Sequence, residues 1–166
     1  MKRKSVFWIL FAIVALTVIM FVGSNPNSAL VPYYGKWSGG FNVEAFRLGQ
    51  GSQKLRDRAS LRGYLMLYAT GKKFKLHLEG EQEIIDLDGT WTVEKGRVML
   101  RTKATKIDDM GGEEARDPNK FFVTGEAIRD AYARPIPLKL SKDKQKLTGL
   151  RITIGQYEGT HEFTRG

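Results

Sequence analysis

Few side chains in this sequence could perform acid–base or metal chemistry. The chain contains two histidines and no cysteine, which excludes disulfides, thiolate metal sites and thiol nucleophiles. His77 alternates with lysines, so we expect it to face solvent. His161 shares a strand face with Phe163, so we expect it to be buried with its ring hydrogen-bonded. Two histidines in these contexts do not have the spacing of a metal site.

The carboxylates do not form a catalytic or metal-binding pattern either. Asp86 and Asp88 could pair for general acid–base work, but their position beside a turn predicts that both face water. The acidic stretch 108–117 lacks the alternating ligands of an EF-hand loop. The sequence also has no nucleophile elbow, phosphate loop or dinucleotide fingerprint. We therefore expect a protein that is not an enzyme and that uses no metal ion and no cofactor.

The first 23 residues predict a membrane segment. Residues 1–4 are basic, and residues 5–23 form a run of 19 residues without a charge. As a helix this run would be about 28 Å long, which matches the hydrocarbon thickness of a bilayer. The basic start should stay in the cytoplasm. We therefore expect a single-pass membrane protein whose domain is extracytoplasmic, at the periplasmic or cell-surface side of a cell envelope, or secreted if the segment is cleaved as a signal peptide.

The rest of the chain predicts a short linker and one folded domain. Residues 24–32 hold two prolines among polar residues, which is typical of a linker. Residues 33–166 contain stretches in which every second residue is apolar. The clearest is Ile84 to Lys103, whose two apolar runs meet at a Lys95-Gly96 turn and predict a β-hairpin.

Similar patterns predict strands on both sides of this hairpin. They cover Tyr33 to Glu44, Leu61 to Ala69, Lys72 to Glu79, Pro135 to Leu140, Lys146 to Ile154 and Tyr157 to Thr164. A short helix capped by Thr124 is expected over Thr124 to Arg134. The fold class is all-β, and we expect an antiparallel up-and-down barrel of about eight strands. The alternative is a β-sandwich.

Three of these strands begin with a glycine followed two residues later by a ring, in Gly35-Lys36-Trp37, Gly89-Thr90-Trp91 and Gly159-Thr160-His161. The Gly-x-Trp at the first strand, followed by repeated hairpins, resembles the lipocalin-like barrels of the calycin group. In that family an arginine from the end of the last strand covers a tryptophan at the barrel base, and Trp37 and Arg165 occupy comparable places. The resemblance implies that the barrel binds a small apolar or amphipathic ligand noncovalently.

Two hypotheses for function follow. In the first, the barrel is a ligand-binding module for a small hydrophobic or lipid-like molecule, bound by rings that face the interior. The candidate ligand-binding residues are Trp37, Phe41, Phe74, Trp91, His161 and Phe163. In the second, side chains fill the barrel, and the domain is a structural module that binds an envelope protein. The candidate partner surface is Tyr64, Met66 and Tyr68.

The chain is basic, with a formal net charge of +9, or +6 without the three basic residues that precede the membrane segment. Because the domain is expected outside the cytoplasm, nucleic acid is not an expected partner, whereas anionic lipid head groups lie close to a tethered domain. The basic residues either form a patch near one end of the barrel or are scattered over its surface. The candidates for such a patch are Lys54, Arg56, Arg58, Arg62, Lys72, Lys73 and Lys75.

Overall fold

The structure, a computed structural model, describes residues 28–46, 60–109 and 122–166. The expected membrane segment, residues 24–27 of the expected linker and the basic residues Lys54, Arg56 and Arg58 lie outside these ranges. Among the residues described, no helix is both long enough and apolar enough to cross a membrane. The chain divides into two compact units, 1–32 and 33–166, and the second contains every strand found in the described ranges.

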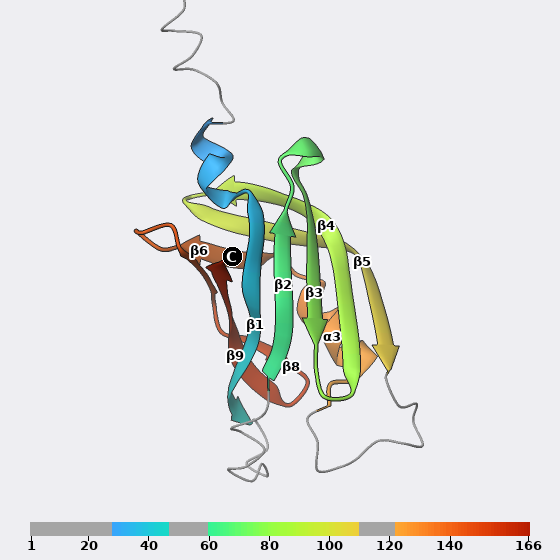
Figure 1. The fold of residues 1–166 in the computed structure, drawn as a ribbon. Helices are drawn as coiled ribbons and strands as arrows, with labels where there is room; N and C mark the ends of the chain where they lie inside the picture. The colour runs from blue at the N-terminus through green and yellow to red at the C-terminus, as the bar shows by residue number, and fades with distance from the viewer. Residues whose placement is uncertain (1–27, 47–59, 110–121) are drawn as a thin grey trace, which may run out of the picture. The chain divides into compact units, whose positions relative to one another are not determined.

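Nine strands form one antiparallel sheet that closes on itself (Figure 1). The strands are β1 (Gly35–Phe46), β2 (Ser60–Leu67), β3 (Lys73–Glu79), β4 (Glu83–Glu94), β5 (Arg97–Asp109), β6 (Ile136–Leu140), β7 (Lys146–Gly149), β8 (Ile152–Ile154) and β9 (Tyr157–Arg165). Each of β1 to β7 pairs with the next strand in the chain, except that β7 pairs with β9, and β9 also pairs with β1. The helical segments are η1 (Ser28–Tyr33), η2 (Thr70–Lys72) and α3 (Gly125–Tyr132).

The expected up-and-down barrel is confirmed, and the β-sandwich alternative is wrong. β7 and β8 pair with successive parts of β9, with Leu147 opposite Phe163 and Ile152 opposite Gly159. The two segments therefore act as one strand interrupted at residues 150–151, and the barrel has eight strands in antiparallel order. The expected single strand from Lys146 to Ile154 is broken at this point.

The alternation seen in the sequence decides which side chains fill the barrel. In β3, Phe74, Leu76 and Leu78 are buried, while the residues between them face outward. In the central hairpin, Lys95 and Gly96 both have positive φ and form the turn, as expected. Within the described residues, the buried hydrophobic side chains all lie between Trp37 and Phe163. A fragment of residues 30–166 therefore contains this core.

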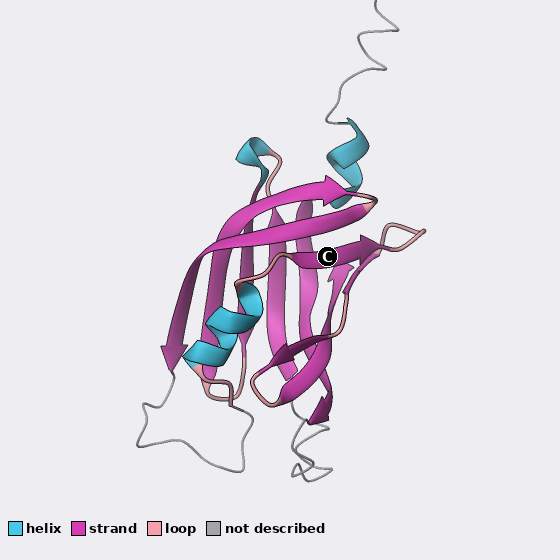
Figure 2. Cartoon of the chain, turned by 180° about the vertical axis from the view of Figure 1, so that it is seen from behind, coloured by secondary structure: helices cyan, strands magenta, loops and turns pink. Residues whose placement is uncertain are grey.

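The helix α3 covers a split in the sheet. β6 pairs with β5 only over Arg97 to Leu100, so the second half of β5 extends beyond β6. α3 lies between this half of β5 and β8 (Figure 2) and buries Ile128 and Tyr132. Its N-terminus is capped by the hydroxyl of Thr124, which accepts a hydrogen bond from the amide of Ala127 at 3.3 Å. The expected helix is confirmed with slightly narrower bounds.

Because neighbouring strands run in opposite directions, the connections alternate between two ends of the barrel. The start of β1, the β2–β3, β4–β5 and β6–β7 turns and the end of β9 lie at one end, which we call the indole end after Trp37 and Trp91. The β1–β2, β3–β4, β5–α3 and β8–β9 connections lie at the other, which we call the Glu83 end. The candidate sites are described relative to these two ends.

Candidate functional site

The indole end of the barrel is closed by Trp37. Its ring is fully buried, and its Nε1–H donates to the backbone oxygen of Tyr33 at 2.9 Å. The guanidinium of Arg165, at the end of β9, lies 4.6 Å from the centre of the indole. This is the contact that the resemblance to lipocalin-like barrels implies, and such a contact contributes about 0.5 to 2 kcal/mol. The backbone oxygen and the guanidinium together hold the indole in place.

Trp91 lies at the same end. It is 1% exposed, and its Nε1–H donates to the backbone oxygen of Tyr68 at 3.1 Å. The ring of Tyr34 meets it edge-on, with ring centres 5.6 Å apart. Since both indole N–H groups have backbone partners, the two tryptophans close this end without leaving a buried donor unpaired.

A polar pair lies inside the apolar barrel. The hydroxyl of Tyr132, from α3, is 3.1 Å from Nε2 of His161, from β9, and both residues are buried. The His161 ring is stacked on Phe163 with centres 5.7 Å apart and packs against Phe41 at 5.4 Å. Its Nδ1 is buried without a hydrogen-bond partner of ordinary geometry. The backbone of Gly40 contacts the imidazole closely enough to raise its pKa, so this nitrogen is poorly paired rather than without any polar neighbour.

This environment determines how the two side chains ionise. Burial lowers the pKa of His161 to about 4, against a weaker opposing contribution from the backbone of Gly40. Burial also raises the pKa of Tyr132 well above its ordinary value. The pair is therefore neutral at physiological pH and can exchange hydrogen bonds with an uncharged polar group.

Glu83 is a second buried polar group, located where β4 begins. Its side chain is fully buried, and neither carboxyl oxygen has a hydrogen-bond partner of ordinary geometry. Burial raises the pKa of this carboxyl to about 7, and the negative charge of Asp109 adds to the effect. The backbones of Val123 and Gln82 lower it only in part. A carboxyl without a strong partner at a barrel end can bind a cationic or hydrogen-bonding group.

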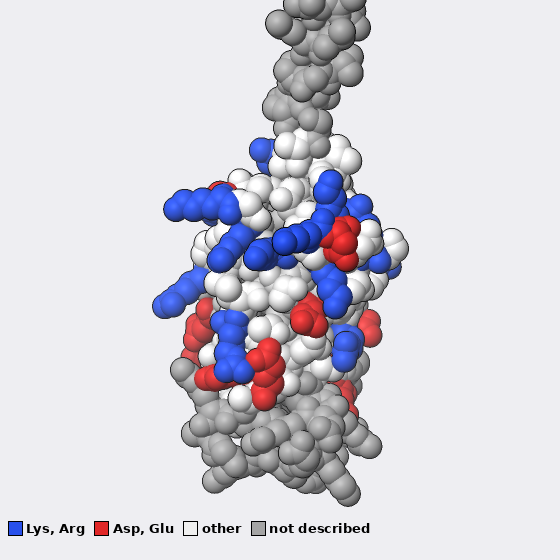
Figure 3. Space-filling model, turned by 90° about the vertical axis from the view of Figure 1, so that its left-hand side faces the viewer, with Lys and Arg blue, Asp and Glu red and all other residues white. Residues whose placement is uncertain are grey.

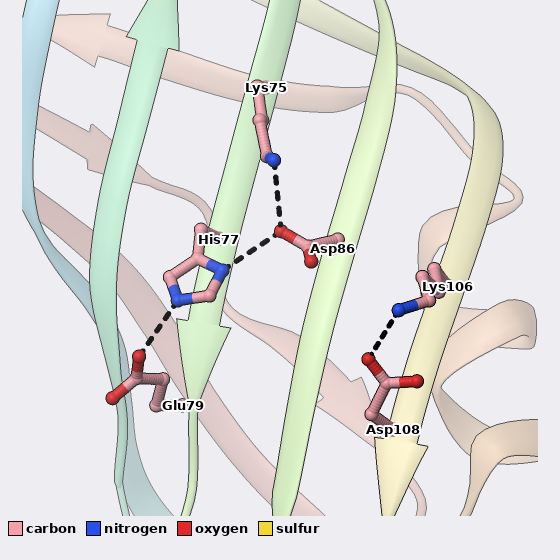
Figure 4. A network of polar contacts seen from close by, with 6 residues as sticks. All are labelled: Lys75, His77, Glu79, Asp86, Lys106 and Asp108. Carbon is pink, nitrogen blue, oxygen red and sulfur yellow. Dashed lines mark hydrogen bonds and ion pairs between the residues drawn. The ribbon is translucent and has the colours of Figure 1, made fainter.

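The outer face of β3 and β4 carries a polar network (Figure 4). Nδ1 of His77 is 2.9 Å from Oδ1 of Asp86, and Nε2 is 2.9 Å from Oε1 of Glu79. Nζ of Lys75 lies 3.6 Å from the same Asp86 oxygen. The His77 ring is also stacked on Tyr64, with centres 5.2 Å apart. His77 faces outward as expected, but it is held by these partners rather than only by water.

The two carboxylates change the ionisation of His77. The hydrogen bond to Glu79, followed by the one to Asp86, raises the pKa of the imidazole above its usual 6.5. Burial alone would raise the pKa of Asp86, but its contacts with His77 and Lys75 lower it overall. The network therefore favours an imidazolium between two carboxylates. These contacts link the outer faces of β3 and β4 by a cluster of charged side chains.

The two histidines are expected to titrate in opposite directions. In an NMR pH titration of residues 30–166, His77 should have its midpoint above 6.5, and His161 should have its midpoint near 4. Glu79→Gln should lower the His77 midpoint and leave His161 unchanged, because it removes the main partner of His77 alone. Glu126→Gln, on α3, serves as the control and should move neither. A His77 midpoint at or below 6.5 would contradict the network.

The predicted ligand-binding rings all face the barrel interior. Five of the six belong to the hydrophobic core and the sixth, His161, is 1% exposed. The structure thus brings the predicted residues into one core, at the indole end for Trp37 and Trp91 and around His161 for Phe41 and Phe163. Phe74 is the second residue of β3 and therefore lies near the indole end.

The three residues predicted as a partner surface are not equally accessible. Tyr64 is half-buried between the His77 ring and Nζ of Lys36, which lies 4.8 Å from its centre. Met66 is also half-buried, and Tyr68 is 46% exposed. Of the three, Tyr68 is therefore the residue most available to a partner.

A groove of about 690 Å³ lies on the outside of the barrel, beside α3 and the interruption between β7 and β8. Its lining includes Ala127 and Ala131 of α3 and the exposed Leu150, and its rim carries Asp130 and Arg151. It contains none of the predicted ligand-binding rings. It is therefore separate from the predicted ligand-binding rings.

The sequence patterns did not point to Glu83 or to the partners of His77 and His161. Glu83 could have been found, because it lies two and four residues before the inward-facing Ile85 and Leu87 and so has the parity of the core. The Tyr132 contact with His161 could not, because it depends on how α3 lies across the sheet. Among the described residues, no group of three His, Asp or Glu side chains is arranged to hold a metal ion.

Comparisons of the chain with protein-family models, with curated proteins and with solved structures found no match.

Proposed function

We propose that this chain is a membrane-anchored, extracytoplasmic binding module whose barrel holds a small amphipathic molecule. Residues 5–23 provide the anchor in this proposal, because their length and lack of charge suit a membrane span. The ligand has an apolar body, which the interior rings contact, and a polar group, which pairs with the buried polar side chains. The barrel is a binding module and not an enzyme.

The observation that supports ligand binding most strongly is Nδ1 of His161, which lies inside an apolar core with no hydrogen-bond partner of ordinary geometry and only a weak contact with the backbone of Gly40. A buried polar atom without a partner costs about 1 to 3 kcal/mol, so folded proteins rarely keep one unless water or a ligand pairs with it. Aromatic rings surround this nitrogen, with Phe41 and Phe163 within 6 Å between ring centres. Small-molecule sites are usually apolar with a few convergent polar groups, and the residues around this nitrogen have that composition.

The two barrel ends suggest how such a ligand would be oriented. The indole end is closed by the buried Trp37 and Trp91. At the other end Glu83 has a buried carboxyl without a hydrogen-bond partner of ordinary geometry, and the backbones of Val123 and Gln82 stabilise its charge only in part. We propose that the ligand enters from the Glu83 end and that a hydroxyl or amine of the ligand can pair with this carboxyl. This extends the site beyond the six rings identified from sequence.

The test is native mass spectrometry of residues 30–166 purified from cells without detergent. We expect a retained small molecule on the wild type and on His77→Leu, which changes the outward-facing histidine. His161→Leu should lose it, because this variant removes the poorly paired nitrogen. Tyr132→Phe removes only a hydroxyl and should also weaken retention. It therefore keeps the test valid if His161→Leu disturbs folding. A bare mass for the wild type, also after incubation with a lipid extract, would refute ligand binding.

A second candidate function is a filled barrel that binds an envelope protein. It is supported by Tyr68, whose aromatic side chain is 46% exposed beside the half-buried Met66. Exposed tyrosines are enriched at protein interfaces. A bare mass in the experiment above would favour this function, and Tyr68→Ser should then reduce partner capture.

A further inference from the structure

The indole end of the barrel is strongly basic. Among the described residues, its turns and strand ends carry ten exposed basic side chains and two acidic ones, which leaves eight positive charges. The basic residues are Lys36, Lys72, Lys73, Lys95, Arg97, Lys139, Lys142, Lys144, Lys146 and Arg165. The acidic ones are Glu94 and Asp143. We call the ten basic residues the basic patch.

Strand direction brings these residues together although they are far apart in sequence. Lys72 and Lys73 lie at the β2–β3 turn, Lys95 at the β4–β5 turn and Lys142 at the β6–β7 turn. All three turns lie at the same end because the strands alternate in direction. Glu94 is one of the two acidic residues. Its Oε1 lies 2.8 Å from Nη2 of Arg101, a residue outside the patch, so its charge is already paired.

The opposite end has the reverse charge. Its described residues include exposed acidic side chains at the β3–β4 turn, at the end of β5 and at the start of α3. They include Glu79, Glu81, Asp108, Asp109 and Glu126. Figure 3 shows this polarity on one face, where Lys and Arg gather toward the top and Asp and Glu lie mainly below. The grouping expected from sequence is wrong in part, because Arg62 pairs opposite Glu79, near the Glu83 end, while Lys72 and Lys73 lie at the indole end.

The position of the patch matches the place where the chain enters the barrel. β1 begins at the indole end, and only nine residues separate the charge-free run, which ends at Gly23, from Tyr33. Nine residues span at most about 32 Å even when fully extended. If residues 5–23 are anchored in a bilayer, the start of β1 and the surrounding turns therefore stay close to the membrane surface.

We infer that the basic patch binds anionic phospholipid head groups of the membrane that holds residues 5–23. Lysines are compact, strongly hydrated charges on flexible stems, so several of them on adjacent turns can contact different phosphates of a fluid surface. The lipid surface would hold the indole end down and leave the Glu83 end facing away from the membrane. This inference rests on the anchoring part of the proposed function and not on a ligand in the barrel.

The test uses the full chain reconstituted into lipid vesicles. Because the chain has no cysteine, a single cysteine introduced at the exposed Thr70 or Glu81 can carry one fluorescent donor. Thr70 lies at the indole end and Glu81 at the other. Energy transfer to acceptor lipids then reports how close each end lies to the bilayer. The neutral vesicles contain phosphatidylcholine alone, and the anionic vesicles contain about 30% phosphatidylglycerol to resemble an anionic leaflet.

Energy transfer from Thr70 should be about twofold higher on anionic than on neutral vesicles. Raising the salt concentration to 0.5 M, about five times 0.1 M, should abolish this difference, because salt screens the charge of the lipid surface. The triple variant Lys95→Glu, Lys142→Glu, Lys146→Glu should also abolish it. The matched control Arg62→Glu, Lys106→Glu, Arg129→Glu changes the net charge equally at other sites and should retain it. Transfer from Thr70 that does not depend on lipid charge, as a patch reserved for an acidic protein would give, would overturn the inference.

The same samples separate this inference from the anchoring on which it rests. Flotation with neutral vesicles tests the anchor alone, because those vesicles offer no anionic head groups. A chain that fails to float with neutral vesicles refutes anchoring by residues 5–23. The basic patch must then still recruit that chain to anionic vesicles through Lys95, Lys142 and Lys146, and failure to do so would refute the patch as well.

Discussion

Replacing Gly40 with alanine is expected to lower the free energy of unfolding by about 3 to 5 kcal/mol, a large part of the stability of a domain this size. A Cβ at this position would overlap the backbone oxygen of Leu61 on β2 and lie 2.8 Å from its carbonyl carbon. β1 cannot move away, because Gly40 lies opposite Arg62 of β2 on one side and Glu162 of β9 on the other. Separating either pair would open the barrel.

The effect can be measured by urea unfolding of residues 30–166, followed by tryptophan fluorescence. Ser38→Ala is the matched control, because it changes a small exposed side chain two residues away on the same strand. It should alter stability by no more than about 0.5 kcal/mol. Equal stability of the two variants would show that β1 and β2 can separate at Gly40, contrary to the closed sheet described here.

The sequence predicts the strands of this barrel well because one face of each strand is buried. Where inward and outward positions differ in polarity, as Leu76 and Lys75 do, the period of two determines both the strand and its orientation. Gly96, between two alternating runs, is an independent signal of a tight turn. The structure confirms this turn, in which Lys95 and Gly96 both adopt positive φ. Closure of the sheet was expected only from the number and regularity of the hairpins.

The features that sequence could not predict depend on contacts between distant segments. The interruption at Leu150 and Arg151 is one example, because the change of parity between the buried Leu147 and Ile154 marks a break in the sequence but not the contact that positions it. The guanidinium of Arg151 hydrogen-bonds the carboxylate of Glu44, with its Nη2 at 2.6 Å, which ties the interruption to the end of β1. Such a contact over more than one hundred residues leaves no mark in a local pattern. The basic patch likewise appears only when strand direction is known.

The candidate site was predicted in composition but not in its polar chemistry. Rings such as Trp37 and Phe163 have the parity of the core, and the structure buries both. The polar groups of greatest interest are Glu83 and Nδ1 of His161, and they matter because packing leaves both without a hydrogen-bond partner of ordinary geometry. The absence of a partner is a property of the packed interior and cannot be read from residue types.

Glu83 is expected to make the protein less stable as the pH rises from about 4.5 to 7. In the folded state burial raises the pKa of this carboxyl from 4.5 to about 7. Between these values the folded chain keeps a proton that the unfolded chain has released, so the free energy of unfolding decreases with pH. A shift of this size corresponds to about 3 kcal/mol, since one pKa unit is 1.36 kcal/mol. The contribution is fully present below pH 4.5 and is lost above pH 7.

Glu83→Gln tests this directly, because glutamine keeps the shape of the side chain and cannot ionise. Urea unfolding of residues 30–166 at pH 4.5 and at pH 7.5 should show that the wild type loses about 3 kcal/mol more than the variant over this interval. Glu126→Gln, which changes an exposed carboxylate on α3, should follow the wild type. If all three proteins depend on pH equally, Glu83 is not the buried carboxyl with a raised pKa described here. If the glutamine variant is more stable at pH 7.5, the native carboxyl is retained at a cost in stability, which is what a group reserved for a ligand requires.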